Sequence, residues 1–597
     1  MRKIWGSLAC MVTVLIVWSS LTIAATTTES TATTAPDYNA LEKAAFKGDS
    51  QALAQLQAAA NSGDANAQDN LGIYYYSKKD NQNAAVQGTE AVWDDPQDNL
   101  NYNGQATQED YVQAFNWFQK SAQQGYATAQ DNVGVLYCNG QGTSQDYVQS
   151  FNWFQKSAAQ GYAGGENALG YAYEHGKGTE QNYTQAFNWF QKSAAQGYAA
   201  GEHNLGYAYA NGQGTPQDYT QAFNWFQKSA AQGFAIGEDA LGMAYYNGQG
   251  TKQDYAQAFN WFQKSAAQGD AAGENNLGYA YYCGQGTQQD YTQAFNWYQK
   301  SAAQGDAAGE YDLGNAYMNG QGTPQDYTQA FNWYQKSAAQ GYAWGEDRLG
   351  NAYYYGQGTP QDYTQAFNWY QKAAAQGDAT GEDDLGMAYY NGQGTPQDYT
   401  QAFNWYQKSA AQGYALGEDG LGNAFYYGQG TKQDYTQAFN WYQKSAAQGD
   451  AEGENNLGMA YANGQGTPQD YTQAFNWLQK SAAQGYAMGE NNLGMAYYNG
   501  QGTPQDYTQA FNWFQKSAAQ GLAVAERDLG STYLNGQGTP QDDTQAFNWL
   551  EKAAVQGDAT SCQDLSYMYN NGLGVAADQQ KAQYWAQQAK KFQSEGN

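Results

Sequence analysis

Side chains able to do chemistry recur along this 597-residue chain at a fixed distance of 36 residues. A glutamate column runs in 36-residue steps from Glu166 to Glu526. An aspartate column includes Asp110, Asp146 and Asp218. A calcium site needs six to eight oxygen ligands, and general acid–base catalysis needs a carboxyl group paired with another group in a pocket. One carboxylate per loop meets neither need, so the repetition predicts a structural role for both columns.

Three other features that could carry out chemistry have little support in the sequence. The segment "QKSAAQG" places a Ser directly after a Lys, whereas an activated serine of the Ser-x-x-Lys type needs the opposite order and a longer spacing. The loop "NGQGTPQD" contains Gly-x-Gly but lacks the preceding strand and the Lys-Ser/Thr of phosphate-binding loops. The chain has two histidines, His175 and His203, so the commonest catalytic bases and metal ligands are nearly absent. We therefore predict no enzyme activity, no catalytic residue, no cofactor and no metal site.

The elements that carry these columns are set by a repeat of 36 residues. Trp recurs at this step, without exception, from Trp117 to Trp585. Such a period indicates a solenoid or a propeller, and the hydrophobic pattern inside one unit decides between them. No segment alternates with a period of two over a useful length, which argues against strands.

One unit, Gly237 to Gly269, predicts two helices. In the second half, Asp254 stands at an N-cap position and Gln257 at N3, a capping-box arrangement, and Gly269 ends the helix. The apolar stripe of this helix comprises Tyr255, Ala258, Phe259, Trp261, Phe262, Ser265 and Ala266. The first half, "GEDALGMAYYNG", has Leu241, Ala244 and Tyr245 at helical spacing and stops at Gly248. Neither helix can bury its stripe alone, so the units must stack. The predicted fold class is all-α: an α/α superhelical solenoid of 36-residue helix-turn-helix repeats.

The chain divides into five predicted regions. Residues 1–25 have the charged start, the apolar run and the small residues of a secretory signal peptide, although the apolar run is long enough for an uncleaved anchor. A Thr-rich spacer follows at 26–36, and capping helices are expected at 37–62. An array of about fourteen repeats covers 63–597. The first repeat carries an insertion at 78–106.

The charge and cysteine content of the chain limit the partners that it can bind and the bonds that it can form. The 27 Lys and Arg against 56 Asp and Glu give a formal net charge of −29, and this excess of negative charge repels nucleic acid. After the signal, the odd number of cysteines, Cys138, Cys283 and Cys562, is no disulfide framework. We expect an exported protein, periplasmic or secreted, that does not contact the membrane once the signal is cleaved.

The repeat resembles the Sel-one-like repeat family, a relative of the tetratricopeptide repeats. The resemblance rests on Leu241, Gly242, Tyr245, Gly248, Gly250, Asp254, Ala258, Trp261, Ala266, Ala267 and Gly269. Departures are a Gly where the first helix usually opens with Ala, as at Gly237 and Gly273, and Ser566 in place of Gly in the last unit. The resemblance implies a superhelix that scaffolds or adapts protein complexes; bacterial members are often exported, and some act in envelope maintenance or host interaction.

The first helices hold the positions that vary between repeats. The columns of Ile236, Asp239, Ala240, Met243 and Tyr246 lie opposite the packing face. By the resemblance, this helix lines the concave surface. The predicted binding residues are Tyr246, Tyr282, Tyr311, Met318, Trp344, Tyr354, Tyr390, Tyr426, Met488 and Tyr498, with Leu416 beside them. Neutral drift in a recently duplicated array is the alternative.

Two functions remain open. The first is an exported scaffold or adaptor that holds protein partners on the concave surface of its first helices. The second is an envelope protein that binds glycan or peptidoglycan, because Tyr and Trp rings stack on sugars while Asn and Gln supply neutral hydrogen bonds.

Overall fold

The computed structural model describes residues 36–78 and 106–595, and the described part of the chain is helical, with no strand. The predicted signal peptide at 1–25, the spacer up to residue 35 and residues 79–105 of the predicted insertion lie outside the described residues. In the described part, no helix is both long and apolar enough to cross a bilayer.

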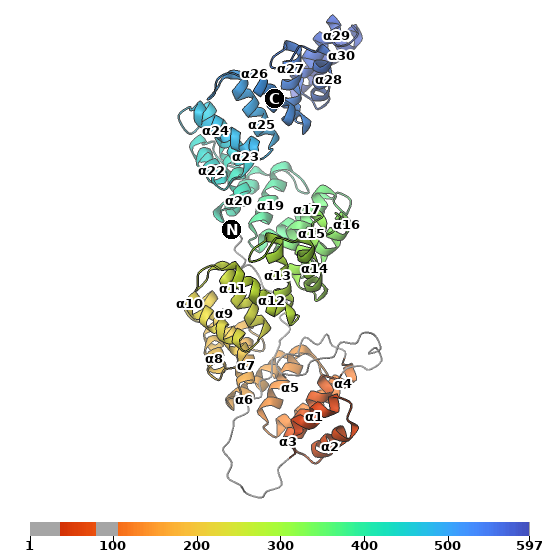
Figure 1. Ribbon diagram of the computed structural model, residues 1–597, viewed down its shortest axis with the longest axis vertical. Helices are drawn as coiled ribbons and strands as arrows, with labels where there is room; N and C mark the ends of the chain where they lie inside the picture. The colour runs from red at the N-terminus through yellow and green to blue at the C-terminus, as the bar shows by residue number, and fades with distance from the viewer. Residues whose placement is uncertain (1–35, 79–105, 596–597) are drawn as a thin grey trace. The chain divides into compact units, whose positions relative to one another are not determined.

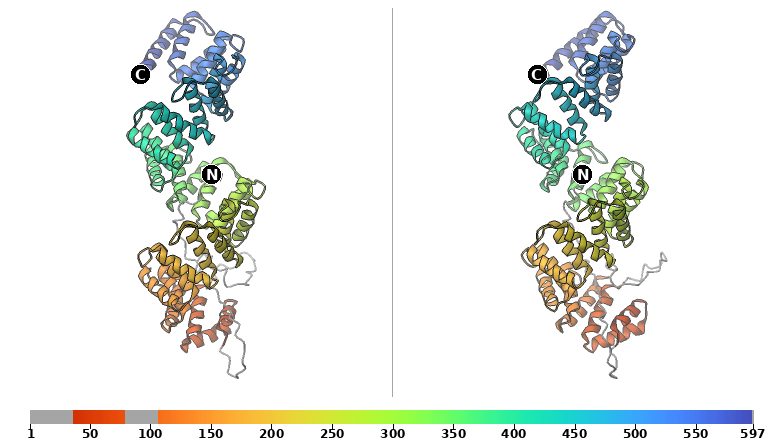
Figure 2. Two further views of the ribbon diagram at one scale, coloured as in Figure 1. Left: turned by 90° about the vertical axis from the view of Figure 1, so that its left-hand side faces the viewer. Right: turned by 60° about the vertical axis from the view of Figure 1, so that its left-hand side comes forward.

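The chain separates into two compact units, residues 1–340 and 341–597. The helices of unit 1 are α1 (Tyr38–Phe46), α2 (Ser50–Asn61), α3 (Ala65–Tyr76), α4 (Gln108–Gln123), α5 (Ala127–Asn139), α6 (Tyr147–Ala159), α7 (Ala163–His175), α8 (Tyr183–Ala195), α9 (Ala199–Asn211), α10 (Tyr219–Ala231), α11 (Ala235–Asn247), α12 (Tyr255–Ala267), α13 (Ala271–Cys283), α14 (Tyr291–Ala303), α15 (Ala307–Asn319) and α16 (Tyr327–Ala339) (Figure 1). The helices of unit 2, coloured green to blue in Figures 1 and 2, are α17 (Ala343–Tyr355), α18 (Tyr363–Ala375), α19 (Ala379–Asn391), α20 (Tyr399–Ala411), α21 (Ala415–Tyr427), α22 (Tyr435–Ala447), α23 (Ala451–Asn463), α24 (Tyr471–Ala483), α25 (Ala487–Asn499), α26 (Tyr507–Ala519), α27 (Ala523–Asn535), α28 (Asp543–Val555), α29 (Ala559–Asn571) and α30 (Gln579–Glu595) (Figure 2).

Each repeat is a pair of packed helices, and the chemistry at the helix ends explains its length. Gly248 follows α11 in the left-handed region at φ 67°, which a residue with a Cβ adopts reluctantly. Asp254 then caps α12, because its carboxylate accepts hydrogen bonds from the N–H groups of Ala256 and Gln257, both at 3.0 Å. The predicted start of the second helix is confirmed.

The capping box predicted for Asp254 and Gln257 is wrong. The N–H of Asp254 donates to the carbonyl of Tyr245 at 2.9 Å, so it is not available to the Gln257 side chain. A reciprocal box does form at α4, where Thr107 and Asp110 bond to each other through side chain and backbone. The first helix also begins two residues earlier than its acidic residues suggest, at Ala235.

The core of each pair combines large and small side chains. Leu241 and Ala244 of α11 are buried, as are Ala258 and Phe262 of α12. Gly242 permits the close approach of the two helices, because a Cβ at this position would lie 2.6 Å from the Phe262 ring. The predicted stripe of α12 is confirmed: its small residues and Phe262 are buried, whereas Tyr255, Phe259 and Trp261 are half-buried.

Neighbouring pairs stack in chain order within each unit. The second helix of one pair packs on the first helix of the next, as α10 does on α11 and α20 does on α21. Successive first helices also pack on one another, as α11 does on α13 and α19 does on α21. We define the surface formed by the first helices of each unit as its inner face, and that formed by the second helices as its outer face. The all-α solenoid predicted from the repeat is confirmed.

Candidate functional site

The glutamate column is part of the packing between helices. All eleven glutamates from Glu166 to Glu526 accept a hydrogen bond from the Gln that ends the second helix of the same repeat, over 2.7–2.8 Å. Glu238 is typical, 5 % exposed and bonded by Gln268 Nε2. A carboxylate held in this way is a structural group, as its repetition predicted.

The serine and aspartate columns are structural as well. Ser229 is fully buried, and its hydroxyl donates to the carbonyl of Ala199 at 2.8 Å, which leaves no room for a substrate. Asp218 caps α10 through two backbone N–H groups. Asp110 departs from its column: it lies inside α4, 8 % exposed, and pairs with Lys78 Nζ at 2.9 Å. Asp110 therefore stands at N3 of a capping box and not at the N-cap position that Asp218 and Asp254 occupy.

The Gly-x-Gly loop connects the two helices of one repeat and packs on the second helix of the preceding repeat. Gly250 sits directly on the carbonyl of Tyr219 in the preceding second helix, and a side chain here would collide with that oxygen. The φ angle of Gly250 is 72°, so two independent constraints require glycine at this point. The loop acts as a turn, as the sequence indicated.

The Trp side chains of the 36-residue column contact a Lys of their own helix and pack on the preceding repeat. Trp261 packs against the core cluster that includes Phe226 and Leu241. Lys264 Nζ lies 3.6 Å from the centroid of the Trp261 ring. The same Lys–Trp contact recurs in thirteen repeats at 3.5–3.8 Å. The sequence carried this signal, Trp-x-x-Lys at a helical i, i+3 spacing, and it was missed.

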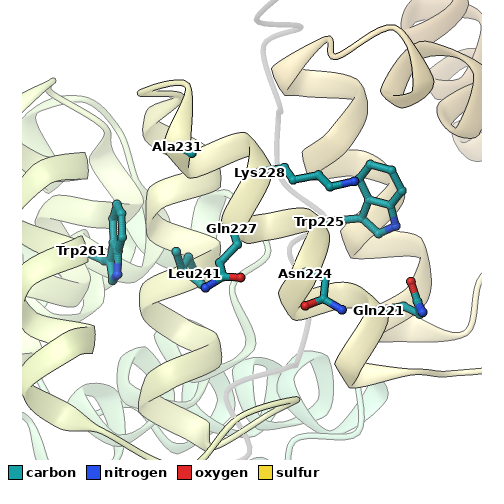
Figure 3. A pocket seen from close by; sticks show the side chains of 8 residues that line it. All are labelled: Gln221, Asn224, Trp225, Gln227, Lys228, Ala231, Leu241 and Trp261. Atoms are coloured by element: carbon teal, nitrogen blue, oxygen red, sulfur yellow. The ribbon is translucent and has the colours of Figure 1, made fainter.

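A shallow cleft of about 700 Å³ opens on the outer face between α10 and α12. Figure 3 shows Lys228 extended along the Trp225 ring on one side, Trp261 on the other, and Leu241 between them. Gln221, Asn224 and Gln227 add amide groups to its wall. A second cleft, of about 490 Å³, is lined by the six equivalent residues of α14, including Trp297 and Lys300. Lys228 and Lys300 each lie over a Trp ring, and both rings are half-buried against core clusters, which leaves less open ring for a sugar to stack on.

Nine of the ten predicted binding residues are half-buried on the first helices. Four of them bind the loop of the next repeat: their hydroxyl groups donate to a Gln side chain 39 residues ahead, over 2.6–2.9 Å, in the pairs Tyr246–Gln285, Tyr354–Gln393, Tyr426–Gln465 and Tyr498–Gln537. These tyrosines therefore contribute to the joint between repeats as well as to the surface.

Tyr311 is the exception, and its predicted place on an open surface is wrong. Its side chain is only 4 % exposed, and its ring lies 6.4 Å from that of Tyr334. The angular position of Tyr311 on its own helix suggested an open face, but the neighbouring helix covers it. Among the described residues, the exposed aromatic residues of the first helices are instead Tyr355 and Tyr427, each 60 % exposed, and Tyr567 of α29, which is 58 % exposed. The sequence offered a signal for the exposure of Tyr355 and Tyr427. At the equivalent position α11 has Asn247 and α19 has Asn391, and Asn is usually exposed.

A row of Asn and Asp side chains links successive first helices. Asn276 Nδ2 donates to Asp239 at 2.8 Å, and Asn456 Nδ2 donates to Asp419 at 2.9 Å. Burial and the nearby Asp270 raise the pKa of Asp239 to about 8, although the hydrogen bond from Asn276 lowers it. Each such bond joins residues 37 positions apart, so the row runs from repeat to repeat.

At one point in unit 2 this row pairs two acids. Asn351 Nδ2 donates to Asp384 at 3.0 Å and to Asp347 at 3.3 Å, which brings both carboxyl groups to one amide. Burial, together with the partner carboxyl, raises the pKa of Asp347 well above its ordinary value. The Oδ1 atom of Asp347 has no hydrogen-bond partner within the described residues. Two carboxyl groups this close cannot both ionise easily, so the pair retains a proton.

No group of three or more His, Cys, Asp and Glu side chains stands in position to hold a metal ion within residues 36–78 and 106–595. His203 is buried against the Phe226 and Phe234 rings, and burial lowers its pKa to about 4. It is neutral at physiological pH.

The comparison with family models decides the identity of the repeat. The model of the Sel1 repeat matches at residues 99–126, 127–162, 163–198, 199–234, 236–270, 271–306, 307–342, 346–378, 381–414, 415–450, 451–486, 487–522, 523–558 and 559–591. The chain belongs to the Sel1 repeat family. Among solved structures it is similar to a protective antigen of uropathogenic Escherichia coli with an SLR fold, at 35 % identity over 74 % of this chain and 95 % of the other, with a TM-score of 0.47. It is also similar to a Sel1 repeat protein from Oxalobacter formigenes, at 28 % identity over 41 % of this chain and 96 % of the other, with a TM-score of 0.37. No curated protein matches it.

Sel1 repeat proteins are in general scaffolds for protein interaction, and proteins of this family are typically non-catalytic. The contacts above agree with that character, because the conserved-looking Glu, Ser, Asp and Gly columns of these Sel1 repeats are all engaged in packing, capping or turns.

Proposed function

We propose that this Sel1 repeat protein is an exported scaffold that holds extended segments of partner proteins on the inner face of its first helices. One observation supports this above the others. The second helices keep the same caps, Lys–Trp contacts and core residues, whereas the inner face changes from repeat to repeat and includes the exposed rings of Tyr355 and Tyr427. Tyr and Trp are among the residues enriched in interface cores.

The glycan alternative has less support from the outer-face Trp rings, and the open rings available to it include Tyr355 and Tyr427 on the inner face. Sugar binding by stacking requires an aromatic ring with a free face, and the Trp rings of the outer face carry Lys at 3.5–3.8 Å while they pack on the preceding repeat. A protein segment needs no such free Trp face. Export is proposed from the pattern of residues 1–25. Envelope maintenance and host interaction are the settings we propose for the scaffold.

Site-specific photo-crosslinking in the producing cell tests the binding face. A photoreactive phenylalanine would replace Leu416 or Tyr427 on the inner face, and Gln227 or Gln299 on the outer face; all four side chains are exposed. We expect the inner positions to yield one shared cross-linked protein that the outer positions do not. Equal cross-linking from both faces would contradict the proposal.

Export has its own test. Cell fractionation followed by N-terminal sequencing should find the chain outside the cytoplasm and starting close to residue 26. A chain that begins at Met1 in the membrane fraction would show that residues 1–25 are an uncleaved anchor.

A further inference from the structure

The first helices α17, α19, α21 and α23 of unit 2 carry two exposed tyrosines on the inner face. Tyr355 packs edge-on against Tyr354 with ring centroids 4.8 Å apart, and Tyr427 packs in the same way against Tyr426. The supporting tyrosines are themselves held by Gln393 and Gln465 in the following loops. Each exposed ring is therefore fixed in orientation while 60 % of its surface is open.

Carboxyl groups lie beside both rings. Asn351, one helical turn before Tyr355, donates to Asp384 at 3.0 Å, and Asn423, one turn before Tyr427, donates to Asp419 at 2.9 Å. Burial, helped by Glu452 on α23, raises the pKa of the Tyr427 hydroxyl. Asp384 and Glu452 are half-buried, so they border the surface and do not lie in the core. The two rings and these acids lie on α17, α19, α21 and α23, four first helices that pack on one another in succession; we call this set the patch.

This patch has one cation of its own, Arg348, which acts on Tyr355 and Asp384. Arg348 is the single basic residue in α17, α19, α21 and α23. Within the described residues, neither Asp419 nor Glu452 forms an ion pair. Since the four helices carry several acids against this single cation, a cationic ligand would add the charge of which the fold supplies little here.

We propose that this patch binds an extended, cationic polypeptide segment, with one arginine side chain stacked on Tyr355 and another on Tyr427. The proposal rests on the scaffold function and names the chemistry of the partner. A planar guanidinium can stack on a Tyr ring and at the same time bond a carboxylate through two N–H groups, as at Asp384 or Glu452.

The spacing of the two rings sets the length of the segment. Tyr355 and Tyr427 are two repeats apart, which is about 20 Å at 8–10 Å between packed helices. An extended chain rises about 3.3 Å per residue, so roughly six residues span the two rings. A ligand that contacts both rings must span this distance. A polypeptide segment does so, whereas a single small cation does not.

An end-blocked hexa-arginine peptide is the probe, titrated against the full chain at about 0.15 M salt, where exposed charges more than about 8 Å apart are largely screened. The variant Y355N/Y427N replaces both rings by the Asn found at Asn247 and Asn391, so each repeat keeps a residue it already tolerates. We expect binding to weaken at least tenfold while thermal unfolding is unchanged. Equal affinity of parent and variant would overturn the proposal.

A second pair of variants separates the patch from the general negative charge. D384N/E452A uses the residues found at Asn456 and Ala272 and should weaken binding at least fivefold. D398N/D434N removes the same number of carboxylates from the loops, and Asn182 shows that Asn can serve as such a cap. This control should change affinity less than twofold. An equal loss in both variants would mean that the peptide follows net charge only, and would reject the site.

The failure of this inference is distinguishable from the failure of the scaffold function. If the inner-face cross-links identify a partner whose bound segment is neutral or acidic, the scaffold holds and the cationic class is wrong. If no inner-face partner exists, the scaffold function itself fails, whatever hexa-arginine does.

Discussion

The outer and inner faces of this array use the same 36-residue unit in opposite ways. On the outer face, Asp caps, the Lys–Trp contact and a Phe, Tyr or Leu in the core recur with little change. On the inner face, neighbouring first helices touch, and each junction uses its own mixture of Tyr, Asn and Asp. Contacts made in every repeat hold the stack together, whereas contacts that differ between repeats make its segments chemically distinct.

The largest test of this contrast is removal of an outer-face Trp. Trp261→Ala should lower the free energy of unfolding by about 3 kcal/mol, near the lower end for large aromatic residues because the ring is half-buried. Chemical denaturation of the full chain measures it, and part of the loss should appear as fraying of neighbouring repeats. Lys264→Ala is the matched control and should cost about 0.5–1 kcal/mol, the value of an exposed cation–π contact. If the two substitutions lower the free energy of unfolding equally, the Trp ring stabilises the chain mainly through its contact with Lys264.

The inner face should respond to pH. Burial raises the pKa of Asp69, Asp131 and Asp239 to about 8, so the folded chain holds protons that the unfolded chain releases above its ordinary Asp value. Stability should therefore fall as pH rises from about 4 to 8. His203, with its pKa lowered to about 4, acts in the opposite direction below its ordinary value, but it is a single group.

Asp239→Asn isolates this effect, because Asn275 and Asn455 occupy the same position in other repeats. We expect the variant to be more stable than the parent by about 2 kcal/mol at pH 8, and by less at pH 5, since burying an ionised group is what the substitution avoids. Thermal unfolding at the two pH values measures it. A gain that is the same at both values would assign the effect to packing and not to ionisation.

A buried hydroxyl offers a smaller test. Tyr334 donates to Asn315 Oδ1 at 2.9 Å across the pair α15–α16. Asn315→Met leaves this hydroxyl without that partner and should cost about 1–2 kcal/mol. The double variant N315M/Y334F recreates the Met243–Phe262 combination of α11 and α12 and should recover most of the loss. Strict additivity of the two changes in denaturation would refute the pairing.

The smallest effect is expected at the caps. Asp254→Ala removes the acceptor of two backbone N–H groups and should cost about 1 kcal/mol, whereas Asp254→Asn should be nearly neutral because Asn182 caps α8. Hydrogen exchange of the first turn of α12 reports this locally. Equal protection from hydrogen exchange in the parent and the Ala variant would show that the Asp254 cap does not stabilise the start of α12.

Much of the candidate face could be predicted from the sequence, but not which of its residues are open. The helical wheel placed Tyr246, Tyr354 and Tyr426 on the right side of the first helix, yet it said nothing of their bonds to Gln residues 39 positions ahead. Some missed contacts did leave a trace. Asn315, Asn351 and Asn423 each accompany a Tyr 19 residues later, a pairing visible by comparing repeats.

The sequence by itself determined the period, the helix pair, the turn and the caps, because these depend on residues close in the chain: a Gly that adopts positive φ, an Asp that accepts from the next N–H groups, and an apolar stripe at 100° steps. Only the tertiary structure decided that Tyr311 is buried, that Tyr355 and Tyr427 are exposed, and that Asp347 and Asp384 meet. Burial depends on the side chains that the neighbouring helices bring, and a single helix does not encode them.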